Sequence, residues 1–208
     1  MAISIYQLKP AFTAFLRPLA AAMAGAGISA NQVTVAACLL SCLYGLLLFF
    51  FSTYFIVWLL LPLWLVLRMA LNAIDGILAR EHGQQSNLGA ILNEMGDVLA
   101  DAALLAPLAF VPGVHWAAVA LFLWAALLTE FAGVLALLVG GPRRYDGPMG
   151  KSDRAFLLLL SSLLVACGLL LNRDFSFWLN LLLWAGVLLM CLTMINRLSK
   201  ALSGGGKS

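Results

Sequence analysis

Charged side chains are scarce in this sequence. Only 10% of the 208 residues are Asp, Glu, Lys or Arg, and the formal net charge of +3 is too small for a nucleic-acid-binding surface. Hydrophobic residues make up 63% of the chain and its mean hydropathy is +1.02, which excludes an ordinary soluble domain and a disordered chain. The composition therefore predicts an integral membrane protein that contacts lipid and has no nucleic-acid partner.

Metal-binding cysteine patterns and a cleavable leader are also missing. The first 27 residues lack a basic region followed by one uninterrupted apolar run, so they do not resemble a cleaved signal peptide. All cysteines fall inside apolar segments without the spacing of metal ligands. We therefore interpret them as buried small hydrophobic residues, namely Cys38, Cys42, Cys167 and Cys191.

Apolar segments of membrane-spanning length are abundant. A helix needs roughly 20 residues to cross the hydrocarbon core, and six segments approach that length. We therefore predict an all-α integral membrane fold that forms one domain over residues 1–208, with a six-helix transmembrane core over 33–195. The predicted spans lie near residues 33–51, 54–77, 88–111, 115–139, 154–171 and 175–195.

The two ends of the chain differ from this core. Residues 1–28 predict an amphipathic helix that lies along the membrane interface and is broken by Pro10 and Pro18. Ser29 and Asn31 are suitable N-caps for the first span. Residues 196–208 predict a flexible cytoplasmic tail.

Basic residues occupy alternate connections between the spans, which is the pattern of cytoplasmic loops in membrane proteins. We therefore expect both termini and the functional site to face the cytoplasm, in the inner membrane of a bacterium. The basic connections contain Lys9 and Arg17, then Arg80, then Arg143, Arg144, Lys151 and Arg154, and finally Arg197, Lys200 and Lys207.

The segment 71–101 holds five of the nine acidic residues of the chain. At 100° per residue, Asn93, Asp97 and Asp101 form one stripe on a helix, and Glu94 falls in the same sector. Asn72 and Asp75 share a face of the preceding helix, so oxygen ligands from two helices would converge. Hard divalent cations prefer such oxygen ligands. The alternative is a set of interhelical hydrogen bonds, or a buried ion pair with Arg68 or Arg80.

The spacing of these residues resembles the signature of the CDP-alcohol phosphotransferases. That signature reads Asp-x-x-Asp-Gly-x-x-Ala-Arg, eight residues, then Gly-x-x-x-Asp-x-x-x-Asp, and "DGILAR" at 75–80 with Gly89 and Asp97 fits it. This chain departs from the signature at two of the four aspartates, where it has Asn72 and Asn93. Amides still offer ligand oxygens, but the site loses two negative charges.

The resemblance implies a reaction and its site. The four signature positions, Asn72, Asp75, Asn93 and Asp97, would hold two divalent ions, Mg²⁺ or Mn²⁺, on the pyrophosphate of a CDP-linked lipid such as CDP-diacylglycerol. Asp97 would act as general base for an acceptor hydroxyl, CMP would leave, and the enzyme would be a homodimer. The donor nucleotide would lie against Asp75, Gly76, Ala79, Arg80 and Gly89.

Other polar residues have two interpretations each. Glu94 and Asp101 can compensate for the missing carboxylates or support the ligands from outside. Glu130, inside an apolar segment, either supports the site or forms a helix-packing hydrogen bond. The basic loop either sets topology or binds a phosphate on the acceptor, and its basic residues are Arg143, Arg144, Lys151 and Arg154.

Two functions of other classes stay open beside phosphatidyl transfer. Asn72 and Asn93 are also expected of a lipid- or nucleotide-binding pseudoenzyme that has lost its metal ions. Buried acids are also typical of small transporters. The sequence does not identify the acceptor alcohol.

Overall fold

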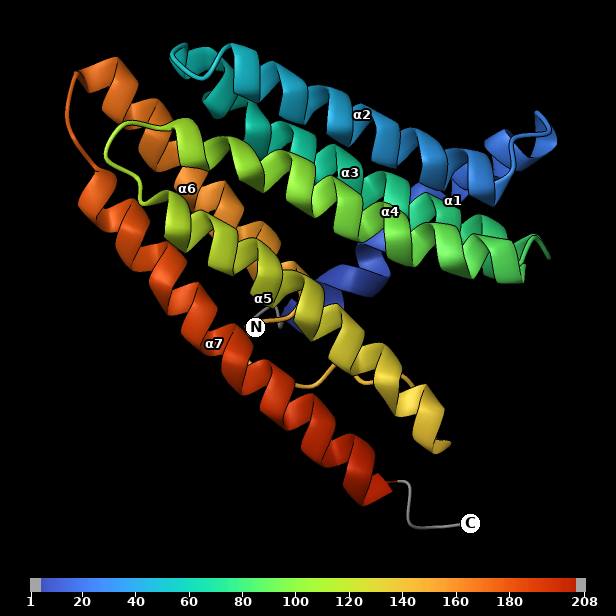
Figure 1. The fold of residues 1–208 in the computed structure, drawn as a ribbon. Helices are drawn as coiled ribbons and strands as arrows, with labels where there is room; N and C mark the ends of the chain where they lie inside the picture. The colour runs from blue at the N-terminus through green and yellow to red at the C-terminus, as the bar shows by residue number, and fades with distance from the viewer. Residues whose placement is uncertain (1–4, 205–208) are drawn as a thin grey trace. The chain divides into compact units, whose positions relative to one another are not determined.

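The computed structural model describes residues 5–204, with side chains from 11 to 203, and within that range it contains helices and no strand (Figure 1). The predicted all-α class is therefore confirmed. In chain order the elements are α1 (Ile5–Gly25), α2 (Ala30–Phe50), α3 (Phe55–Glu81), α4 (Asn87–Leu105), η1 (Ala106–Phe110), α5 (Trp116–Leu135), η2 (Ala136–Val139), α6 (Lys151–Leu171) and α7 (Ser176–Gly204).

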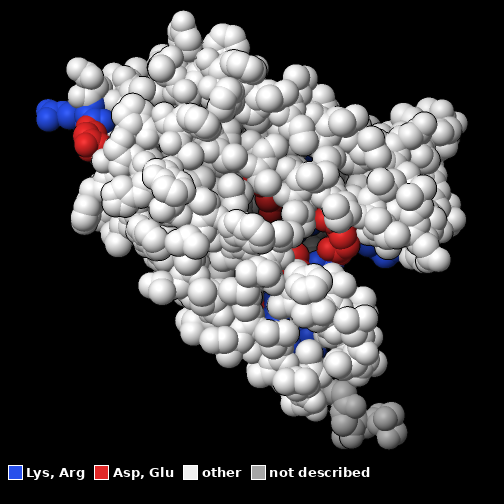
Figure 2. Space-filling view, in the orientation of Figure 1, with Lys and Arg blue, Asp and Glu red and all other residues white. Residues whose placement is uncertain are grey.

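Five of the described helical segments are long and apolar enough to cross a membrane. They are α2, α3, α5 with η2, α6 and α7. On the face shown in Figure 2 most of the surface is uncharged, as lipid contact requires. The helix α4 is not among the five, because it carries Glu94, Asp97 and Asp101 within 19 residues. The predicted count of six spans therefore stays a prediction.

The ends of the chain correct two expectations. The helix α1 runs from Ile5 to Gly25 without the predicted breaks at Pro10 and Pro18. Its Leu16 and Ala20 are buried in a core cluster with residues of α2 and α3, and this packing outweighs the backbone hydrogen bonds that proline cannot make. Its position at a membrane interface stays a prediction. At the other end, α7 continues to Gly204, so residues 196–204 are helix, whereas 205–208 lie outside the described residues.

The cysteines correct a third expectation. Cys167 and Cys191 are exposed on the helices, and Cys38 and Cys42 are only half-buried. A soluble protein would bury such residues, but a helix surface that faces lipid gains nothing by covering them.

The chain forms two compact units, which we describe separately. The first consists of α1, α2 to Leu43, α3 from Leu63 and α4 to Ala100. Its α2 begins with a capping box, because Ser29 Oγ accepts the Gln32 N–H at 3.2 Å and Gln32 Oε1 accepts the Ser29 N–H at 2.8 Å. Ser29 is thus confirmed as an N-cap, whereas Asn31 lies inside α2.

The second unit contains residues 44–62 and everything from Asp101 onward. Its α5 and α7 lie side by side (Figure 1). One side chain of α7 joins their ends, since Asn180 accepts the His115 N–H at 2.8 Å and donates to the Gly113 carbonyl at 2.9 Å. The helix α6 ends at Asn172 in the left-handed region, a conformation that asparagine tolerates at helix ends.

Candidate active site

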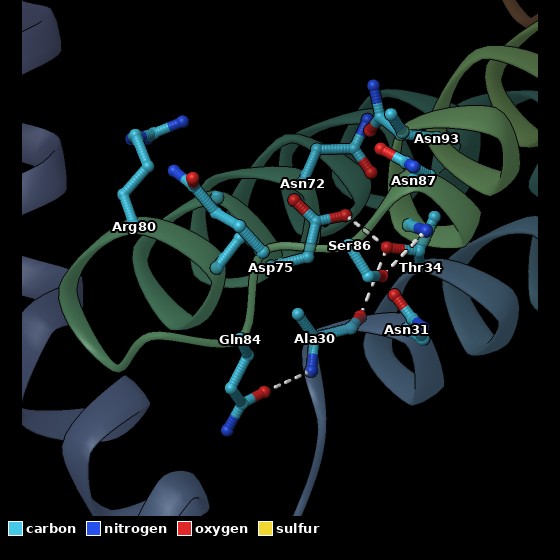
Figure 3. A pocket seen from close by; sticks show the side chains of 15 residues that line it. Ala30, Asn31, Thr34, Asn72, Asp75, Arg80, Gln84, Ser86, Asn87 and Asn93 are labelled. Carbon is cyan, nitrogen blue, oxygen red and sulfur yellow. Dashed lines mark hydrogen bonds between the residues drawn. The ribbon is translucent and has the colours of Figure 1, made fainter.

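A polar cavity of about 580 Å³ opens in the first unit. Three helices and the loop between α3 and α4 line it (Figure 3). The walls include a single acid and a single base, Asp75 and Arg80, and the other polar side chains are uncharged amides and hydroxyls. The amides belong to Asn31, Asn72, Gln84, Gln85, Asn87 and Asn93, and the hydroxyls to Thr34 and Ser86.

Asp75 is the buried acid of this cavity. Its side chain comes from α3, and the residue is 6% exposed. The Thr34 hydroxyl of α2 donates to Asp75 Oδ2 at 2.8 Å, and the same hydroxyl oxygen lies 3.1 Å from the Ala30 carbonyl oxygen. A hydroxyl has one proton, so Thr34 can donate to only one of these two acceptors at a time. Figure 3 shows Asp75 near Asn72 and Asn93, with Arg80 on the opposite side of the view.

Hydrogen bonds at the starts of α2 and α4 shape the rim of the cavity. Ser86 Oγ accepts the Gly89 N–H at 2.9 Å at the start of α4, and Gln84 Oε1 accepts the Ala30 N–H at 2.6 Å at the start of α2. A Cβ at position 89 would lie only 2.6 Å from Asn31 Oδ1. Glycine at position 89 therefore leaves room for the Asn31 amide between α2 and α4.

Asp97 lies next to this lining and contacts it through Asn72. The Asn72 amide nitrogen donates to Asp97 Oδ1 at 3.0 Å, and Arg68 Nη2 lies 3.1 Å from the same oxygen. Arg68 Nη2 also donates to the Asp97 carbonyl at 3.3 Å. Arg68 and Asp97 are 7% and 9% exposed. The buried ion pair that the sequence offered as an alternative to a cation site is therefore present.

The two additional acids of α4 do not line the cavity. Glu94 is half-buried. Asp101 belongs to the second unit, where its Oδ2 lies 3.3 Å from Arg154 Nη2. Neither residue supplies a carboxylate to the walls that hold Asp75.

Glu130 organises a buried ionic cluster in the second unit. Its carboxylate oxygens lie 2.8 Å from Arg143 Nη2, 2.8 Å from Arg154 Nη2 and 3.7 Å from Arg197 Nη1. Arg154 and Arg197 are 4% and 1% exposed. We call Asp101, Glu130, Arg143, Arg154 and Arg197 the Glu130 cluster.

The remaining basic residues of the loop are placed differently. Arg144 Nη2 donates to the Lys200 carbonyl at 2.9 Å, and Lys151 is the half-buried first residue of α6. Sequence reasoning assigned Arg197 only to topology and missed its place in the cluster. The available signal was its position in "MINRLSK", two residues after the apolar run that ends at Ile195.

The structure thus brings the predicted donor-binding residues together. Asp75, Gly76, Ala79, Arg80 and Gly89 line one cavity with Asn72 and Asn93. Their roles in binding and catalysis stay predictions.

The cavity offers few carboxylate ligands for a divalent cation. Within residues 5–204 no group of three or more His, Cys, Asp or Glu side chains is arranged to hold a metal ion. Asp75 with the amide oxygens of Asn72 and Asn93 offers the hard ligands that Mg²⁺ or Mn²⁺ prefers. Asp97, the other signature carboxylate, already accepts from Arg68 and Asn72.

Comparisons with known proteins identify the family of this chain. The sequence model of the family described as CDP-alcohol phosphatidyltransferase matches residues 28–192. Inner membrane protein YnbA of Escherichia coli is 46% identical over 195 residues, which cover 94% of each chain. Archaetidylinositol phosphate synthase of Pyrococcus horikoshii is 27% identical over 157 residues, or 76% of this chain and 81% of that one.

Solved structures share the fold. The phosphatidylinositol phosphate synthase PgsA1 of Mycobacterium tuberculosis with CDP-DAG bound has a TM-score of 0.70 at 18% identity, covering 92% of this chain and 96% of that one. Its complex with manganese and citrate has a TM-score of 0.72 at 19% identity, covering 92% and 91%. The family match spans well over half of the sequence and includes every residue of the cavity. The chain therefore belongs to the CDP-alcohol phosphatidyltransferase family.

Proposed function

We propose that this chain transfers a phosphatidyl group from CDP-diacylglycerol to a hydroxyl acceptor, with release of CMP, in phospholipid biosynthesis. The observation that carries the proposal is one polar cavity in a chain of apolar helices, lined together by the signature residues Asp75, Gly76, Ala79, Arg80 and Gly89. A donor with a lipid tail and a charged nucleotide requires such a site beside lipid.

The relatives support the same reaction. The structural neighbour PgsA1 holds CDP-DAG in one structure and manganese with citrate in another, and a curated relative is an archaetidylinositol phosphate synthase. The relative YnbA is an inner membrane protein, which supports a bacterial inner membrane for this chain. Within it we place both termini and the cavity on the cytoplasmic side, from the distribution of Lys and Arg, and we propose a homodimer by analogy with the family.

The chemistry needs a base and neutralisation of charge on the phosphate oxygens. The acceptor oxygen bonds to the phosphorus that carries the lipid, and the bond from that phosphorus to the oxygen of CMP breaks. Asp97 takes the acceptor proton, and Arg68 and Asn72 fix the orientation of its carboxylate. Arg80 and the amide side chains bind the donor. A divalent ion at Asp75, Asn72 and Asn93 would neutralise charge on the phosphate oxygens.

The acceptor side is proposed to involve the basic loop and the start of α6. Arg143 and Arg154 already pair with Glu130, so a phosphate on the acceptor would have to share them. Lys151 opens α6, where backbone N–H groups also favour phosphate, and Arg144 lies in the same loop. Glu94, Asp101 and Glu130 then act as supports that position other residues.

The decisive experiment measures CMP release by the purified full-length chain in nanodiscs. We expect release that requires both CDP-diacylglycerol and one of a panel of hydroxyl acceptors, among them glycerol phosphate, inositol, inositol phosphate and serine. An active relative of known acceptor serves as positive control for the assay. Absence of CMP release with every acceptor and with either Mg²⁺ or Mn²⁺ would contradict the proposal.

Asn72 and Asn93 favour a second candidate, a pseudoenzyme that binds a CDP-linked lipid without turning it over. The two candidates differ in a simple way. The pseudoenzyme would bind CDP-diacylglycerol in a tryptophan-fluorescence titration and release no CMP, whereas the enzyme would do both.

A further inference from the structure

We propose that Arg68 takes the place of one of the two divalent cations that the family signature implies, so that this chain binds a single divalent ion, at Asp75. The inference rests on the proposed function, because it concerns the metal content of the same site. It starts from a disagreement between the signature and the side chains that surround Asp97.

The first argument is charge balance. Four aspartates balance two divalent cations, four negative charges against four positive ones. This chain keeps two carboxylates at those positions, Asp75 and Asp97, since the other two residues are Asn72 and Asn93. These two carboxylates balance at most one divalent ion, and the guanidinium of Arg68 already neutralises one of them. A second divalent ion would add two positive charges to a buried site that already contains a cation.

The second argument is the contact between Asn72 and Asp97. The amide nitrogen and the carboxylate oxygen lie 3.0 Å apart, a normal distance for a hydrogen bond. Two carboxylates at this separation would repel each other unless a cation lay between them. The amide therefore removes the need for a cation between positions 72 and 97. Because the side-chain amide is planar and its nitrogen points to Asp97, the Oδ1 atom of Asn72 points away from Asp97.

The third argument is the permanence of the guanidinium. Arg68 precedes Asn72 by four residues, so both lie on one face of α3 and reach the same carboxylate oxygen, Asp97 Oδ1. Arginine stays charged under all relevant conditions. Displacing it from Asp97 would leave a buried cation without its carboxylate, at a residue that is only 7% exposed. The position beside Asp97 thus holds a fixed cation that a dissolved ion cannot readily replace.

The test counts metal ions in the absence of turnover. The full-length chain in detergent is titrated with Mn²⁺, without donor or acceptor, and free Mn²⁺ is measured by electron paramagnetic resonance. We expect one saturable site per chain, which Asp75→Ala abolishes. Two sites of comparable affinity in the wild-type chain would overturn the proposal, and so would the absence of any saturable site.

Substitutions then test the role of Arg68 itself. Asn72→Asp with Asn93→Asp restores the missing carboxylates, and we expect a second, weak Mn²⁺ site because the guanidinium still opposes it. Adding Arg68→Gln should tighten that second site by at least about tenfold, because a like charge at short range has been removed. An unchanged second-site affinity would contradict the proposal.

A matched control and the wild-type count keep the test decisive. Arg17→Gln also removes an arginine from the first unit, but one whose partner Glu81 is exposed, and it should change neither the number nor the affinity of the sites. The wild-type count needs no substitution, so it decides the proposal even if the triple variant does not fold. A chain with two Mn²⁺ sites that releases CMP would overturn this inference alone, whereas one Mn²⁺ site without CMP release would overturn the proposed function alone.

Discussion

The cavity of the first unit and the Glu130 cluster of the second unit bury charge in opposite ways. In the first unit, polar side chains surround a cavity, and its walls include one carboxylate and one guanidinium among many amides. In the second unit, the Glu130 cluster packs three guanidinium groups directly against the carboxylates of Glu130 and Asp101. Polar groups around a cavity are arranged for a ligand, whereas charges that neutralise one another join the helices that carry them. Substitutions in the cavity should therefore affect mainly activity, and substitutions in the Glu130 cluster mainly stability.

The largest expected effect is on catalysis in the first unit. Asp75→Ala and Asp97→Ala should each lower CMP release by about a thousandfold. The first removes the proposed carboxylate ligand of the divalent ion, and the second removes the proposed base. Glu81→Ala is the control, since Glu81 belongs to the same unit and pairs with exposed Arg17. Rates are measured per folded protein, judged by size-exclusion elution. Full activity of Asp97→Ala would show that another group takes the proton.

The next effect is on stability in the second unit. Glu130→Gln keeps the shape of the side chain but removes the charge that Arg143 and Arg154 contact at 2.8 Å. Breaking a buried pair in this way costs about 3–5 kcal/mol. We expect a large drop in the thermal unfolding midpoint in detergent. Asp174→Asn removes a charge from an exposed residue whose replacement can still accept the Ser176 N–H, so it should lower the midpoint far less. Equal midpoints for both variants would contradict this view of the cluster.

A smaller effect separates two glycines of α4. Gly89→Ala would place a Cβ 2.6 Å from Asn31 Oδ1 and 3.1 Å from Ser86 Oγ, so these two side chains of the cavity must turn away, at a cost of about 1 kcal/mol. Gly96→Ala would meet Cys38 at 3.5 Å, an ordinary contact. We expect the first variant to raise the KM for CDP-diacylglycerol and the second to leave it unchanged. The same KM for both variants would show that close approach at position 89 does not shape the donor site.

The smallest effect is a pH dependence at the surface of the second unit. The hydrogen bond from Lys200 holds the pKa of Asp146 below its ordinary value of 3.8. A lowered pKa stabilises the folded chain above that ordinary value, and the contribution disappears as the pH falls through the folded pKa. Asp146→Asn should therefore destabilise the protein by less than about 1 kcal/mol at neutral pH. The difference in unfolding midpoint should vanish in acid, and a difference independent of pH would rule out this ion pair as its cause.

The sequence was sufficient for features that depend on local patterns. Apolar runs located every helix of the core, and Ser29 began its helix as expected because a capping box is local. The prolines at 10 and 18 misled, since the packing of Leu16 and Ala20 that keeps α1 continuous depends on distant residues. Exposure of the cysteines was missed because burial in lipid and burial in protein have the same sequence pattern.

The site shows the same limit. Spacing alone placed Asn72, Asp75 and Asn93 on facing surfaces, and they line one cavity. Spacing did not decide between a cation and Arg68 as the partner of Asp97, because both neutralise a carboxylate. Spacing also did not predict that Arg197 lies beside Glu130, 67 residues earlier in the chain. Such pairings are set by how α5 and α7 pack.

The amide of Asn180 has a consequence for the biosynthesis of this protein. It bonds both to the Gly113 carbonyl and to the His115 N–H, at the start of a helix that is made 65 residues earlier. As the chain leaves the ribosome, that end of α5 must first be satisfied by water or lipid headgroups, because an unbonded peptide group is costly in the membrane. Arrival of α7 then replaces the solvent with a protein side chain. Synthesis of the last helix thus completes the fifth, and a nascent chain arrested before residue 176 should expose the 111–115 turn to proteases that the finished protein resists.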